Sequence, residues 1–188
     1  MSIHLNPQLL REAFLYFCKF PSTTGILNSM FRNAKSSVTD YNTLRASITN
    51  LPDHELVPEI LNFLFSSNED KLKKEIENTT GIFMLLDYGQ LSSAKDNLER
   101  KNDSFDMGII IARKMKPDDY DMAEILLIQD ELLNTVRKVR EQMIADQKYH
   151  PWIKQLDFPH TIIPWYAREL CNATGFSMMF SRTGIDMI

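Results

Sequence analysis

The sequence predicts an α+β fold: an antiparallel sheet with a long loop between two of its strands, packed by one long helix, plus an N-terminal helical extension. Three observations support this class. Two short apolar runs in the middle of the chain have the length of strands, a later stretch has helical spacing, and the end of the chain alternates between apolar and polar residues. A sheet that is covered on one face by a helix buries the apolar residues of all three patterns.

Three helical stretches are expected in the N-terminal extension, residues 1–66. The first begins at Asn6-Pro7, an N-cap followed by a proline at the first helical position, and ends before Pro21. Residues 22–50 are rich in Ser, Thr and Asn and predict a short helix with irregular chain. The apolar residues of Leu56–Phe65 predict the third helical stretch.

The remaining residues, 67–188, form the predicted α+β body. Its first helix begins with the N-cap Asn68 and ends near Asn78. Gly81–Gly89 and Phe105–Arg113 then predict two strands. Between them lies a polar segment that is too long for a tight hairpin, so we expect a long loop there, with a role of its own.

A long helix and two strands complete the body. Asp121 and Glu124 have the spacing of a capping box, and apolar residues recur every three or four positions to about Lys148. Thr161–Tyr166 predicts a strand that its proline confines to a sheet edge. Asn172–Arg182 predicts the last strand, with apolar and polar faces.

Composition and charge exclude several classes of protein. The chain has 188 residues and a net charge of −4, and it is 44% hydrophobic and 24% charged, as in globular domains. No apolar run approaches the about 20 residues that a transmembrane helix needs. The first residues lack the features of a signal peptide, so we expect synthesis inside the cell. Residues 118–150 carry eight acidic and four basic side chains, and no basic face for duplex DNA is evident.

Motifs of catalysis and metal binding are missing from the sequence. The four histidines lack ligand spacing, and His150, His160 and Cys171 would form a metal site only if the fold happened to bring them together. Cys18 and Cys171 predict reduced structural thiols instead of a disulfide framework or a nucleophile. No glycine-rich phosphate loop is present. We therefore expect a protein that is not an enzyme and binds no cofactor or metal.

Two surface features suggest contacts with other proteins. The predicted loop contains Lys95, Asp96, Glu99, Arg100 and Lys101, and it is either a solvated loop or an arm that meets a neighbour or lines a channel. Met179 falls on the polar face of the last strand, between serines, where an apolar side chain can mark a subunit contact.

The order of these elements resembles that of phage tail-terminator and neck (tail-completion) proteins. The resemblance covers residues 67–188 and is carried by Gly81–Tyr88, Phe105–Met115, Asp121–Lys148 and Asn172–Ser181. Proteins of this kind often close with a small residue, a glycine and an alternating apolar strand, as this chain does.

The resemblance implies a homo-oligomer, commonly a sixfold ring, that caps the tail tube or joins it to the head. The expected location is the virion, with assembly in the host bacterial cytoplasm. The expected partners are tail tube and neck proteins, and DNA would pass through a lumen without specific binding; no membrane is involved. Sheet edges are natural sites of ring contact, so Phe176, Met178, Met179 and Phe180 join the loop residues as candidate contacts.

Two other functions are compatible with the sequence. The chain could be an intracellular protein-binding or regulatory module without catalysis, whose helical N-terminal region docks a partner. An enzyme with a diffuse active site is the third interpretation, and the missing motifs count against it.

Overall fold

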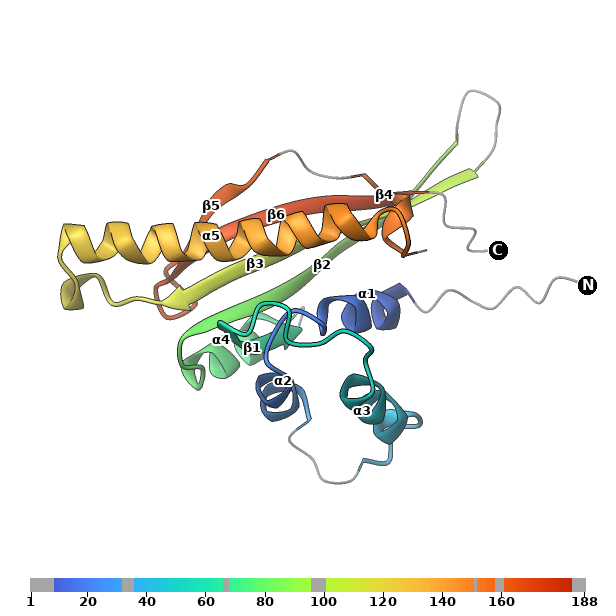
Figure 1. Cartoon of the computed structure of the whole chain (residues 1–188), viewed down its shortest axis with the longest axis horizontal. Helices are drawn as coiled ribbons and strands as arrows, with labels where there is room; N and C mark the ends of the chain where they lie inside the picture. The colour runs from blue at the N-terminus through green and yellow to red at the C-terminus, as the bar shows by residue number, and fades with distance from the viewer. Residues whose placement is uncertain are drawn as a thin grey trace, which may run out of the picture.

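A six-stranded sheet forms the centre of the described part of the chain, which comprises residues 9–31, 36–65, 68–95, 101–150, 152–157 and 161–183 of a computed structural model. The strand order is β1-β2-β3-β6, with β4 and β5 both paired to the far side of β6 (Figure 1). The strands are β1 (Ile60–Phe65), β2 (Ile82–Lys95), β3 (Lys101–Lys114), β4 (Leu156–Asp157), β5 (Ile163–Ala167) and β6 (Ala173–Thr183). Among the strand pairings of the described residues, that of β1 with β2 is the only parallel one. The α+β class is confirmed, and the sheet is mixed where a purely antiparallel one was expected.

Strand β1 stands where the sequence predicted a helical stretch over Leu56–Phe65, so that prediction was wrong. Ile60 and Phe63 are buried on one side of the strand and Leu64 on the other. A parallel strand that is buried on both faces shows no clear alternation, and the period of a short apolar run does not distinguish it from a helix. Pairing with residues 82–86 of β2 makes it a strand.

The predicted long loop, Gly89–Ser104, is for the most part paired strand. β2 and β3 continue past the expected strand ends, and their last described pair is Lys95 with Lys101. The three outermost pairs have no third strand beside them among the described residues. A strand pair of this kind can be polar on both faces, which explains why its sequence resembles a loop. Residues 96–100 lie outside the described part.

The helices are α1 (Leu9–Phe17), α2 (Thr23–Met30), α3 (Tyr41–Thr49), α4 (Glu69–Glu77) and α5 (Met122–Asp146), with 3₁₀ turns η1 (Pro117–Asp119) and η2 (Ile153–Gln155). Of the three predicted caps, Asn68 and Asp121 are confirmed, and Asn6 lies outside the described residues. Asn68 accepts a bond from the Lys71 N–H at 2.9 Å, and Asp121 forms a capping box with Glu124. The described residues of the polar region 22–50 form two helices where one was expected.

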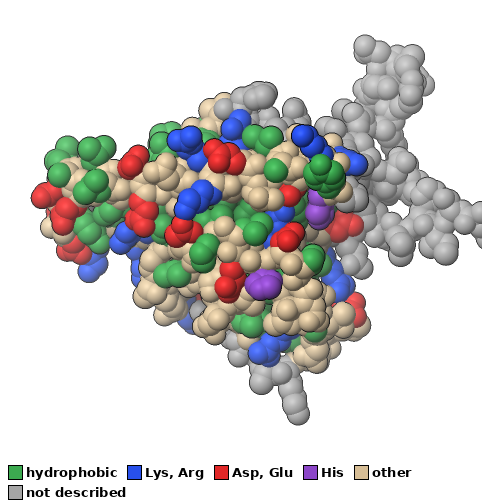
Figure 2. Space-filling view, viewed as in Figure 1, with side chains coloured by type: hydrophobic (Ala, Val, Ile, Leu, Met, Phe, Trp, Pro, Cys, Tyr) green, Lys and Arg blue, Asp and Glu red, His purple; other side chains and the backbone are tan. Residues whose placement is uncertain are grey.

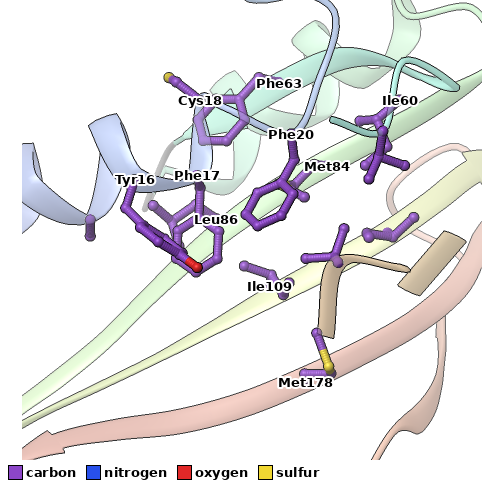
Figure 3. Close-up of a cluster of buried hydrophobic side chains, with 14 of the residues drawn as sticks. Tyr16, Phe17, Cys18, Phe20, Ile60, Phe63, Met84, Leu86, Ile109 and Met178 are labelled. Carbon is purple, nitrogen blue, oxygen red and sulfur yellow. The ribbon is translucent and has the colours of Figure 1, made fainter. Parts of the chain in front are cut away.

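Helix α5 packs along one face of the sheet and buries the main core. Its core-facing side chains recur every three or four residues, as predicted: Ile128, Leu132, Val136, Val139 and Met143. They meet the predicted apolar faces of β3 and β6, namely Phe105, Met107, Ile109, Ile111, Met178 and Phe180. Tyr16 and Phe17 of α1 point into the same space (Figure 3).

The opposite face of the sheet is only partly covered. Leu72 and Ile76 of α4 pack there against Phe83 and other side chains of the sheet. Further along this face, Met179 is exposed and its sulfur lies so close to Gly108 that an added Cβ there would be 2.4 Å from it. The two faces of the sheet are therefore packed unequally.

The predicted boundary between residues 1–66 and 67–188 falls just after β1. The main core includes buried side chains from both sides of this boundary, such as Phe14 and Phe17 before it and Met84 after it. Phe14 and Phe63 meet edge to face, with ring centroids 5.4 Å apart. The N-terminal helices thus share one core with the sheet and α5.

Candidate interaction surfaces

Strand β5 is an edge strand, as its proline predicted. It pairs with β6, and no described strand pairs with its other side. Two large apolar side chains on it are exposed, Ile163 by 48% and Tyr166 by 57%. Ile163 is paired with Ser177, so it lies diagonally from Met179, the exposed methionine of the partly covered face. This edge and the side chains beside it form an open surface at which a neighbouring strand or loop can add.

The other candidate surface is the projecting pair of strands, β2 and β3. Their outer ends extend beyond the body of the molecule (Figure 1). Of the predicted contact residues, Lys95 and Lys101 are a register pair at this end, which brings the two ends of the predicted loop together. Asp96, Glu99 and Arg100 lie outside the described residues.

The predicted contact residues of β6 divide between its two faces. Met178 and Phe180 are buried in the main core, and Phe176 packs against it. Met179 faces the other way and is exposed. These residues were chosen because β6 was expected to lie at a sheet edge, and that expectation was wrong. Strand β3 pairs with one side of β6, and β4 and β5 pair with the other. Of the four predicted contact residues on this strand, Met179 is therefore the one whose side chain is open to a neighbour.

A pocket of about 660 Å³ lies between α1 and the C-terminal end of α5, and no motif in the sequence predicts it. Its walls include Tyr16, Lys19, Asp146, His150 and Trp152. The Tyr16 and Trp152 rings are stacked with centroids 5.2 Å apart, and the His150 ring meets Tyr16 edge to face at 5.1 Å. The residues come from segments more than 120 positions apart, so no local spacing could reveal the site.

An ion pair between Lys19 and Asp146 closes the floor of this pocket. The two charged groups are in direct contact, and their side chains are 9% and 17% exposed. Asp146 also accepts bonds from the Tyr16 hydroxyl at 2.7 Å and from the Gln142 amide at 2.8 Å. The Lys19 ammonium lies 4.2 Å from the centroid of the Tyr16 ring, a cation–π distance.

The pKa values of Asp146, Tyr16 and His150, which line the pocket, are shifted by burial and by this ion pair. Burial raises the pKa of Asp146, but the bonds from Lys19, Tyr16 and Gln142 outweigh it and hold the pKa below its usual value. Burial and the bond to Asp146 raise the pKa of the Tyr16 hydroxyl, which therefore stays protonated. Burial, with the Lys19 charge, lowers the pKa of His150. With its aromatic walls and paired charges, the pocket is suited to receive an apolar side chain.

Both cysteines are free thiols. Cys18 is buried, and burial raises the pKa of its thiol; Cys171 is partly buried beside the smaller core. Within the described ranges, no three His, Cys, Asp or Glu residues gather closely enough to hold a metal ion. The same ranges contain no helix that is both long and apolar enough to span a membrane.

Comparison of the chain with protein-family models, with curated proteins and with solved structures found no match.

Proposed function

We propose that this chain is a structural subunit of a phage tail or neck, which forms a ring that caps the tail tube or joins it to the head. One observation carries the proposal: the sheet is left open to neighbours along β5, beside Ile163 and Met179, and at the projecting ends of β2 and β3. A subunit that works by assembly needs such surfaces, because an unpaired strand edge accepts a strand or loop from a neighbour.

The order of elements supports the same proposal. From α4 to β6 the chain runs helix, strand, strand, long helix, strand, strand, if the two-residue β4 is set aside. The resemblance to tail-terminator and neck proteins rests on this order with a long loop between the first two strands, and the structure has paired strand over much of that loop. We propose tail tube and neck proteins as its neighbours, in a virion that is assembled in the bacterial cytoplasm. DNA would pass through the ring without specific binding, since an acidic wall repels phosphate.

The pocket beside Tyr16 supports a second candidate function, a protein-binding or regulatory module without catalysis. Its aromatic walls can hold an apolar side chain of another protein. Such a module has no need of ring formation, so the oligomeric state of the purified chain separates the two functions.

Light scattering of the full chain over a concentration series, with negative-stain imaging of the same samples, tests the proposal. The expected result is a closed ring whose share grows with concentration. A chain that remains monomeric at the highest concentration reached overturns the proposal and favours the binding module.

A further inference from the structure

We draw no further inference here: the strongest candidate, the exposed apolar surface that Met122, Leu126 and Leu127 form at the start of α5 (Figure 2), carries none because nothing in the structure shows what covers it.

Discussion

Edge strand β1 is covered by α2, whereas the outer side of edge strand β5 has no strand beside it among the described residues. On the β1 side, the Ser22 N–H donates to the carbonyl of Ile60 at 2.9 Å, and the Ser29 hydroxyl donates to that of Phe63 at 2.6 Å. On the β5 side, Ile163 and Tyr166 are exposed. The comparison indicates that the N-terminal segment stabilises the fold by closing one edge, while the C-terminal edge is left for contacts.

Removal of the Asp146 carboxylate should have the largest effect, because this group ties the N-terminal segment to α5. Asp146→Ala leaves the buried Lys19 without its counterion, and breaking a buried ion pair in this way typically costs about 3 kcal/mol or more. Urea denaturation measures the loss of unfolding free energy. Asp130→Ala, an exposed carboxylate on the same helix, is the control. Equal effects of the two substitutions would contradict a structural role for the pair.

The close approach of α2 to β1 can be broken at Gly25. A Cβ at this position would lie 1.9 Å from the Leu61 carbonyl oxygen. Glycine to alanine within a helix normally stabilises by about 1 kcal/mol, but here the overlap should reverse the sign and destabilise by about 2 kcal/mol. Thermal and urea unfolding measure the sign. Asn42→Ala, exposed on α3, should be neutral or stabilising. A stabilised Gly25→Ala variant would show that α2 does not pack tightly on the strand.

A smaller effect is expected from the hydroxyl of Ser29. Ser29→Ala removes a donor from the Phe63 carbonyl on the edge of β1 and should lower the unfolding free energy by about 1 kcal/mol. Ser47→Ala is a matched control, since its hydroxyl donates to the Thr43 carbonyl four residues earlier within α3. Urea denaturation of the two variants should differ; if it does not, the bond to the strand contributes nothing beyond a bond within the helix.

The open edge should tolerate substitution with the smallest change in stability. Ile163→Lys places a charge on an exposed side chain of β5, and we expect the unfolding free energy to stay within about 0.5 kcal/mol of wild type. Urea denaturation checks this value. A loss comparable to that of Gly25→Ala would mean that β5 contributes to the fold as β1 does, and the contrast between the two edges would not hold.

Much of the fold could be predicted where the information is local. The capping box of Asp121 and Glu124 joins residues three positions apart, and the alternation along β3 and β6 repeats every second residue. The failures have a common physical origin. Neither Leu56–Phe65 nor Gly89–Ser104 has a clear period of apolar residues. The first segment is buried on both faces of the sheet, and the outer part of the second extends beyond the third strand.

The candidate contact sites were predicted less well than the fold. Met179 was singled out as an apolar residue on a polar strand face, and it is exposed. The pocket beside Tyr16 was not predicted. Met122 and Leu127 lie in an amphipathic stretch that reads as ordinary helix, and which of its side chains the core leaves out depends on where the sheet ends.

The sequence by itself determined the α+β class, the position of α5 and the last strand, because caps and periodic patterns depend on neighbouring residues. Only the tertiary structure decided that Leu56–Phe65 contributes a strand, that β6 lies inside the sheet, and that Lys19 meets Asp146 across 127 positions. The physical reason is that an edge, a buried pair and a pocket exist only between segments distant in the chain. Their energies come from strand pairing, from desolvation of charges and from side-chain packing between segments, and no single segment of the sequence contains both partners.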